Sequence, residues 1–154
     1  MGTLKILFPY NFTMHDKKAL EFLNKTFARL SDVQITIFNA YTPVTEMETG
    51  DESVMARMKS NINFLHQKLV EKENELKIVQ NQLQKGFSES QVRYIFKPRK
   101  KKDIATEIVD LASYENFDII ILNRKPAKIT RFFTGSIFSK VVNGLPDKIV
   151  CIVT

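Results

Sequence analysis

The chain has 154 residues, the size of one domain spanning 1–154, and its 44% apolar and 26% charged residues exclude a disordered or fibrous protein. A single cysteine, Cys151, excludes an internal disulfide and a cysteine-based zinc site. The net charge of +6 arises entirely in residues 92–154, where twelve Lys and Arg outnumber six Asp and Glu, since residues 1–91 carry eleven of each. This basic half indicates either an anionic partner or only a need for solubility.

Strand and helix patterns alternate from the amino terminus, which is typical of a parallel α/β fold. The apolar run from Leu4 to Pro9 predicts a first strand, and Val33 to Ala40, rich in β-branched residues, predicts a second. Between them, Thr13 and Asp16 have the spacing of a capping box and predict the start of a helix. One face of this helix is expected to be apolar and to consist of Ala19, Leu20, Leu23, Phe27 and Leu30.

A long helix is predicted over residues 55–83, and Gly86 supplies a stop after it. Its apolar residues recur at spacings of three and four and are interrupted only at Lys72; they are Met55, Met58, Ile62, Leu65, Leu69, Leu76, Val79 and Leu83. Such a stripe suits either a coiled coil or a helix packed along a sheet. We favour packing along a sheet, because strand patterns flank the helix on both sides.

The second half of the chain continues the alternation. Val92 to Lys97 alternates in the manner of a half-exposed strand at a sheet edge, and Ile104 to Ala112 has the apolar spacing of a helix. Phe117 to Leu122 is the most apolar strand pattern and is expected to be central. Ser136 is placed to cap a fourth helix, and Lys148 to Val153 predicts a fifth strand. The patterns therefore predict a parallel sheet packed between helices.

Cations gather where ligands of such a sheet bind, beyond the carboxyl ends of the strands and at the point where the strand order reverses. Nine cations follow the third and fourth predicted strands: Lys97, Arg99, Lys100, Lys101, Lys102, Arg124, Lys125, Lys128 and Arg131. We call five of them the basic rim, namely Lys97, Arg99, Lys100, Arg124 and Lys128. Gly135 and Ser136 begin the fourth helix at the same edge, where free N–H groups can hold a phosphate, although such a pair alone is more often a turn and an N-cap.

From Leu4 to Thr154 the chain resembles the universal stress protein family. The resemblance rests on the last strand and on four segments: Lys5-Ile6-Leu7-Phe8-Pro9, Ile35-Thr36-Ile37-Phe38-Asn39-Ala40, Phe117-Asp118-Ile119-Ile120-Ile121-Leu122 and Gly135-Ser136-Ile137. It implies an α/β fold in which a five-stranded parallel sheet of order 3-2-1-4-5 is sandwiched by helices. This is the Rossmann-like arrangement of the adenine-nucleotide alpha-hydrolases.

The nucleotide motif of that family is only half present. ATP-binding members carry Gly-x-x-Gly, nine residues, and then Gly-Ser or Gly-Thr; here residues 126–134 are the nine, and Gly135-Ser136 follows them. Leu122 and Lys125 stand in place of the two glycines, and Asn11 stands where ATP-binding members carry an acid. Side chains at both glycine positions would crowd the path of the phosphates. The Lys125 ammonium would then either fill the phosphate site or bind an anion there.

Two functional interpretations follow from this degenerate motif. In the first, the protein is a non-catalytic stress-response module that acts on a protein partner and has lost or weakened ATP binding. In the second, it is a nucleotide-binding protein in which Gly135-Ser136 and the basic rim hold ATP or another phosphate-bearing anion. Both use the same candidate crevice residues, which are Asn11, Ala40, Leu122, Lys125, Gly135, Ser136 and Ile137.

No residue pattern of a catalytic centre is present. The sequence lacks a Gly-x-Ser-x-Gly elbow and a His-Glu-x-x-His motif, and its carboxylates have no paired spacing. Cys151 lies in an apolar strand and is expected to be a core residue, while His15 and His66 are expected at the surface without a metal. We therefore expect no enzyme activity beyond slow hydrolysis of a bound nucleotide.

The last strand, Lys148 to Val153, predicts a homodimer, because a bare apolar edge strand pairs readily. The resemblance implies the same, since universal stress proteins dimerise through this strand. Binding of nucleic acid ranks last, because no recognition helix is found near Tyr10, Tyr94 and Phe96 on the basic side.

The sequence shows no segment that targets the chain to a membrane. Its longest uncharged run, Val33 to Thr45, has 13 residues, too few to span a bilayer. No secretory signal is present either, so we expect a cytoplasmic protein without membrane insertion.

Overall fold

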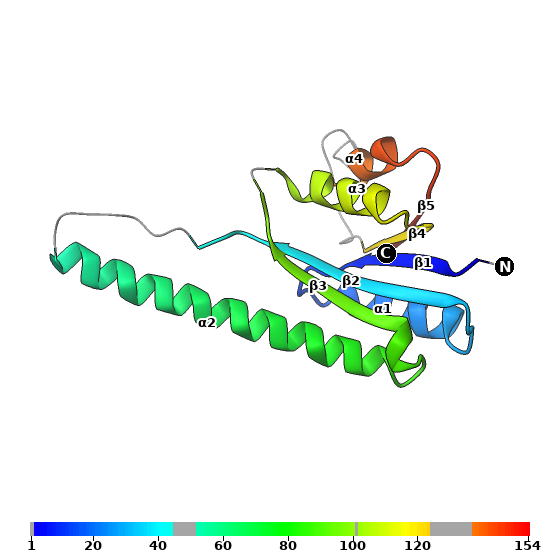
Figure 1. Ribbon diagram of the computed structural model, residues 1–154, viewed down its shortest axis with the longest axis horizontal. Coiled ribbons are helices and arrows are strands. Elements are labelled where there is room, and N and C mark those ends of the chain that lie inside the picture. The colour runs from blue at the N-terminus through cyan, green and yellow to red at the C-terminus, as the bar shows by residue number, and fades with distance from the viewer. Residues whose placement is uncertain (1, 45–51, 101, 124–136) are drawn as a thin grey trace.

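The computed structural model describes residues 2–44, 52–100, 102–123 and 137–154. Its centre is a parallel sheet of five strands in the order β3-β2-β1-β4-β5 (Figure 1). The strands are β1 (Leu4–Pro9), β2 (Val33–Tyr41), β3 (Val92–Pro98), β4 (Ile119–Asn123) and β5 (Ile149–Val153). The α/β class and the order 3-2-1-4-5 that the resemblance implies are thus confirmed.

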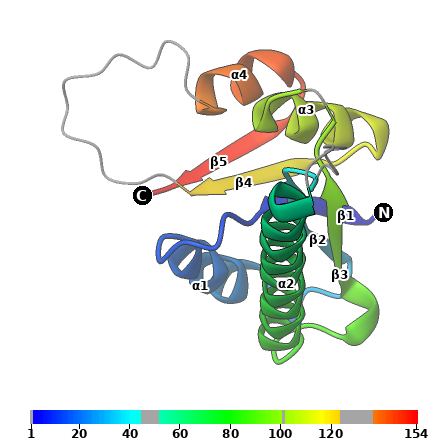
Figure 2. The same cartoon turned by 90° about the vertical axis from the view of Figure 1, so that its left-hand side faces the viewer.

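Helices cover both faces of the sheet. The first face carries α1 (Asp16–Phe27) and α2 (Glu52–Leu83), and the opposite face carries α3 (Ile104–Tyr114) and α4 (Ile137–Gly144), as Figures 1 and 2 show. A short 3-10 helix, η1 (Glu89–Gln91), leads from α2 into β3. Among the described residues, no helix is long and apolar enough to cross a lipid bilayer.

The central strand β1 contributes to the packing on both faces. Ile6, Leu7 and Phe8 are all completely buried. Because successive side chains of a strand point to opposite faces, Ile6 and Phe8 pack with α1 and α2, whereas Leu7 packs with α3 and α4. Each residue of this segment therefore belongs to one of two hydrophobic cores that share a single sheet.

The predicted apolar face of α1 is correct except at its end. Ala19, Leu20 and Leu23 are buried against the sheet, and Phe27 is partly buried beside them. Leu30 lies beyond the last residue of the helix and is 49% exposed. Positive φ at Arg29, 77°, turns the chain away from the helix axis before Leu30.

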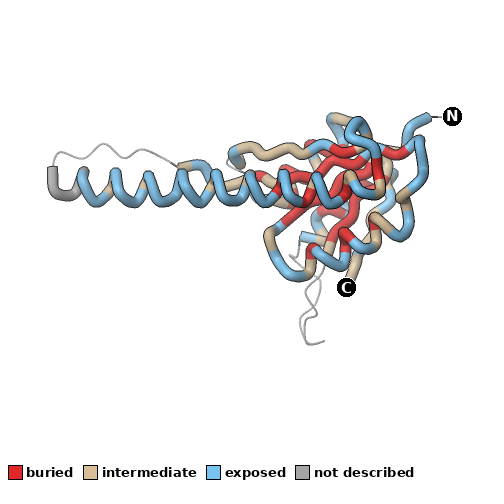
Figure 3. The backbone as a smooth tube through the Cα atoms, turned by 90° about the horizontal axis from the view of Figure 1, so that it is seen from below, coloured by how far each residue is buried: buried red, intermediate tan, exposed pale blue. Residues whose placement is uncertain are grey.

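The long helix α2 packs along the sheet over only part of its length. Leu76, Val79 and Leu83 are buried, but the described residues from 56 to 71 are all exposed or half-buried. Figure 3 shows this part of the helix extending away from the buried centre of the molecule. The expectation of packing along the sheet therefore holds for the carboxyl-terminal third and is wrong for residues 56–71.

Candidate functional site

The carboxyl ends of β1 and β4 border a small pocket, at the position where the strand order reverses. Its volume is about 110 Å³, and the described residues that line it are Pro9, Asn11, Ile104, Ile108, Leu122, Asn123, Ile137 and Phe138. Three residues predicted for the crevice, Asn11, Leu122 and Ile137, thus lie around one pocket. They come from the loop after β1, from β4 and from the start of α4.

The other predicted crevice residues fall elsewhere. Ala40 is buried near the end of β2, opposite Lys97 of β3, and does not line the pocket. Lys125, Gly135 and Ser136 lie outside the described residues, as do Arg124 and Lys128 of the basic rim.

One described cation of the basic rim, Lys97, is paired with a carboxylate of the protein itself. Lys97 Nζ lies 3.3 Å from Glu107 Oε2, and the Glu107 side chain is almost fully buried. The other oxygen of Glu107 accepts a hydrogen bond of 3.0 Å from the Lys100 backbone N–H. Arg99 donates to the Thr42 hydroxyl at 3.4 Å. A carboxylate of α3 therefore offsets the charge of Lys97, while Lys100 contacts it through its backbone N–H and Arg99 contacts a neutral hydroxyl.

The described lining of the pocket is uncharged and mostly apolar. None of its described lining residues carries a charge, and five of them, Ile104, Ile108, Leu122, Ile137 and Phe138, have hydrocarbon side chains. Leu122 is only 4% exposed and packs in the hydrophobic core between the sheet and α3. The leucine at the first glycine position of the family motif thus occupies space inside the fold.

Asp16 is a buried residue of this edge that the sequence analysis treated only as a helix start. Its Oδ2 accepts hydrogen bonds from the backbone N–H groups of Asn11 at 3.2 Å and Thr13 at 2.8 Å, and its Oδ1 accepts one from the Asn123 amide. The Thr13 hydroxyl donates to it as well, so Thr13 does not cap the helix. An acid is therefore present beside Asn11, but groups of the protein itself occupy its oxygens.

These hydrogen bonds fix the loop that follows β1. They engage the backbone on both sides of Phe12, whose φ of 60° is rare for a residue with a side chain. The bond to Asn123 joins this loop to the end of β4. Burial raises the pKa of Asp16 above 3.8, because desolvation outweighs the hydrogen bonds that favour the carboxylate.

The sequence indicates only one of the contacts that Asp16 makes at this edge. The spacing of Thr13 and Asp16 indicated a local bond between them, and this bond exists. Nothing local to the sequence indicates the contact with Asn123, which lies 107 residues away.

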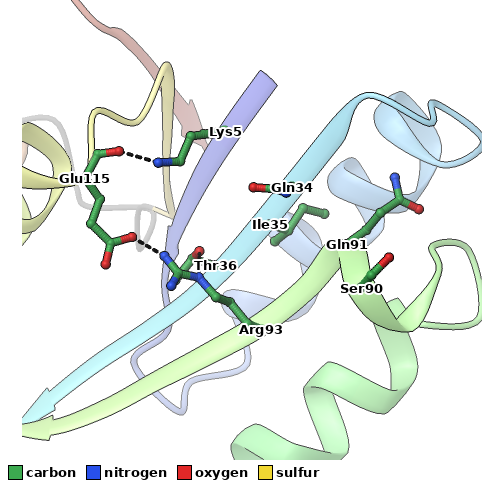
Figure 4. Close-up of a pocket in the computed structure, with 8 residues that line it drawn as sticks. All are labelled: Lys5, Gln34, Ile35, Thr36, Ser90, Gln91, Arg93 and Glu115. Atoms are coloured by element: carbon green, nitrogen blue, oxygen red, sulfur yellow. Dashed lines mark hydrogen bonds and ion pairs between the residues drawn. The ribbon is translucent and has the colours of Figure 1, made fainter. Parts of the chain in front are cut away.

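A larger cavity of about 380 Å³ lies at the amino-terminal ends of the strands, opposite the candidate crevice (Figure 4). Its polar groups are bonded to one another: the Lys5 ammonium donates to the Glu115 carbonyl, and Arg93 bonds to the Glu115 carboxylate and to the Thr36 hydroxyl. The sequence analysis did not predict this cavity. Among the described residues, no group of three or more His, Cys, Asp and Glu side chains is arranged to hold a metal ion.

No protein-family model and no curated protein sequence matches the chain. Solved structures do match it over nearly its whole length. The universal stress protein UspA from Lactobacillus plantarum is 13% identical, covers 100% of this chain and 99% of its own, and gives a TM-score of 0.68. The chain has the fold of the universal stress proteins.

Two other universal stress proteins were solved with nucleotides. One, from Archaeoglobus fulgidus in complex with dAMP, is 17% identical with 100% of both chains covered and a TM-score of 0.63. Another, in complex with cAMP, is 12% identical, covers 99% of this chain and 98% of its own, and has a TM-score of 0.57. At these identities the likeness to universal stress proteins establishes the shared fold.

Replacing Asp16 with alanine tests its role in fixing the loop after β1. Asp16→Ala leaves two backbone N–H groups and the Asn123 amide without an acceptor, so the free energy of unfolding should fall by about 1–3 kcal/mol. Urea unfolding measures this loss. The control is Asp110→Ala, which removes an exposed partner of Lys102 and should cost less than about 1 kcal/mol. Equal losses in the two variants would contradict the role of Asp16.

The pH dependence of stability tests the burial of the same carboxyl group. The pKa of Asp16 is higher in the folded protein than its ordinary 3.8. The protonated carboxyl group therefore contributes fully to stability below pH 3.8, and this contribution is lost as the pH rises through the pKa of the folded protein. Asp16→Asn does not titrate, so it should gain stability relative to the wild type as the pH rises from about 3.5 to 7. Urea unfolding of both proteins across this range measures the difference. If the wild type instead gained stability relative to Asp16→Asn as the pH rises, folding would stabilise the Asp16 carboxylate, and the prediction would be wrong.

Proposed function

We propose that this protein is a universal stress protein that serves as a non-catalytic binding module and whose nucleotide site is degenerate. One observation carries the proposal: the described lining of the pocket at the ends of β1 and β4 carries no charge and is mostly hydrocarbon, with the amides of Asn11 and Asn123 as its polar side chains. At about 110 Å³ the pocket is smaller than the roughly 300–1,000 Å³ typical of ligand sites. A nucleotide would have to displace Leu122 or the segment around it.

The polar groups near the pocket support the same proposal. The carboxylate of Asp16 already accepts four hydrogen bonds from Asn11, Thr13 and Asn123, so it offers little to a ribose hydroxyl. Lys97 is held by Glu107. A phosphate that used Lys97 would leave a nearly buried carboxylate without its cation, which is costly.

A nucleotide-binding function is the second candidate, because two universal stress proteins with this fold were solved with dAMP and cAMP. In this case Gly135-Ser136 would supply backbone N–H groups to the phosphates, and Lys125 would take the place of a glycine.

Thermal unfolding with ATP distinguishes the two candidates. A ligand at about a hundred times its dissociation constant adds roughly 2.7 kcal/mol, which would raise the Tm by roughly 5–10 °C. We expect no such rise for the wild type in millimolar ATP. The double variant Leu122→Gly, Lys125→Gly should acquire one, because it restores both glycines of the motif.

The chain offers a matched control for this experiment. Leu145→Gly with Lys148→Gly removes the same two side-chain types at the same spacing, and Leu145 is as buried as Leu122. This control should not acquire an ATP response. A rise in the wild-type Tm that persists at physiological salt would establish the second candidate and reject the first.

The proposed module is a homodimer formed through the edge strand β5. Within the described part of the chain this strand pairs with β4 alone, and Ile149 and Ile152 are 59% and 43% exposed. Antiparallel pairing with a second copy would satisfy the outer backbone groups of β5 and bury these two side chains. Val150, Cys151 and Val153 are already partly covered by the two hydrophobic cores.

Sedimentation of variants tests the dimer. The wild type should sediment as a dimer at micromolar concentration, and Ile152→Asp should shift it to monomer, because the new charge would be buried beside the paired strand. Tyr114→Asp is the control, since Tyr114 is an 89% exposed residue at the end of α3. A monomeric wild type would refute the dimer, while the proposal on ATP binding would be unaffected.

A further inference from the structure

The part of α2 that projects from the sheet, residues 56–71, contains no buried residue. From Lys72 onward the helix contacts the rest of the domain, and Lys72 Nζ lies 5.6 Å from the centre of the Phe12 ring. Glu73 and Glu75 follow, and they accept hydrogen bonds from the hydroxyls of Tyr94 and Tyr10. A helix as long as residues 56–71 is marginally stable in water without a packing surface.

This projecting helix carries a narrow apolar seam. Met58, Ile62, Leu65 and Leu69 continue the seven-residue repeat of Leu76, Val79 and Leu83, so they extend the same helix face that packs on the sheet. Leu65 is 47% exposed. A strict seven-residue repeat makes the narrow stripe of a helix-to-helix seam, in contrast to the wider apolar face of a helix that lies on a membrane. The exposed Phe64 lies about 100° around the helix from Leu65, outside this seam.

The residues that flank the seam are basic or neutral. Lys59 and His66 lie along one side, and Asn61 and Lys68 lie along the other. The sequence from 53 to 70 contains no Asp or Glu at all, and Arg57 adds a further cation. Lys68 pairs with Glu71 at 2.8 Å, but both side chains are about half exposed, so this pair is weak and can exchange for another carboxylate.

These charges distinguish between the helices that could pack on the seam. In a second copy laid antiparallel over residues 56–71, Lys59 would meet His66, and Lys68 would meet Asn61, which gives no attraction. A helix with carboxylates beside its own apolar seam would pair with Lys59 and Lys68 and bury Leu65. Charge complementarity therefore favours an acidic partner over a second copy.

We propose that residues 56–71 of α2 form a docking site for an acidic amphipathic helix of a partner protein. The docked helix packs on the seam in the manner of a coiled coil, with its carboxylates beside Lys59 and Lys68. Its end reaches the loop after β1, because Phe12 of that loop marks the limit of the projecting part. Asn11 of the candidate crevice adjoins Phe12, so the partner sits next to the crevice.

A designed peptide tests the docking site on the full chain. The probe is a labelled peptide of three heptads with Leu at the core positions and Glu at the flanking positions, and its counterpart has Lys at the flanking positions. Fluorescence anisotropy should show binding of the Glu peptide, weakened by added salt, and binding of the Lys peptide at least about tenfold weaker. Leu65→Glu should weaken binding of the Glu peptide by about tenfold or more, because it puts a charge in the seam.

Val70→Glu is the matched control, because Val70 is 57% exposed, lies about 100° around the helix from Leu69 and outside the seam, and its replacement should change binding less than about threefold. Circular dichroism should show equal helix content in both variants. Failure of the Glu peptide to bind, or equal loss in the two variants, would overturn the proposal.

Two other outcomes would also overturn it. Dimerisation that Leu65→Glu abolishes and Ile152→Asp leaves intact would show that a second copy covers the seam. Cosedimentation with phosphatidylserine vesicles that Leu65→Glu abolishes would show that a membrane covers it.

Discussion

Burial of β1 on both faces is the constraint on which the remaining structure depends. Ile6 and Phe8 belong to the core beneath α1 and α2, while Leu7 belongs to the core beneath α3 and α4. Because β2 lies on one side of β1 and β4 on the other, the chain crosses the sheet in opposite directions from this strand. The crevice between the ends of β1 and β4 is a consequence of that reversal. Asp16 holds its two sides together through Asn11 and Asn123.

The same packing determines what the crevice contains. Hydrocarbon side chains from α3, α4 and β4 form most of its described walls, and Glu107 of α3 pairs with Lys97 nearby. Among the described residues, part of the positive charge at this edge is therefore offset within the fold. Lys97 lies near the end of β3, where the sequence suggested a cation for the crevice. In the fold, its Nζ lies 3.3 Å from Oε2 of Glu107 in α3. A site made for phosphate would instead leave its cations without internal partners.

Periodic patterns predicted the strands and helices because each records the burial of a local face. The resemblance to universal stress proteins supplied the strand order, which local patterns cannot give. Asp16 and Glu107 were not recognised as buried residues, since their burial depends on Asn123 and Lys97 from distant segments. Leu122 lines the pocket at this edge, and the fixed spacing of the motif is what drew attention to its position in the sequence.

α2 projects beyond the sheet because the helix is longer than the strands beneath it. A helix of 32 residues measures about 48 Å, whereas the nine residues of β2 extend only about 30 Å. A third or more of the helix therefore has no strand beneath it, whichever way it lies. The apolar repeat does not reveal this, because its spacing is the same where Leu76 meets the sheet and where Leu65 projects. An apolar seam that continues past the domain is typical of a helix that packs on a partner, and the cations along its sides are the reason we propose an acidic one.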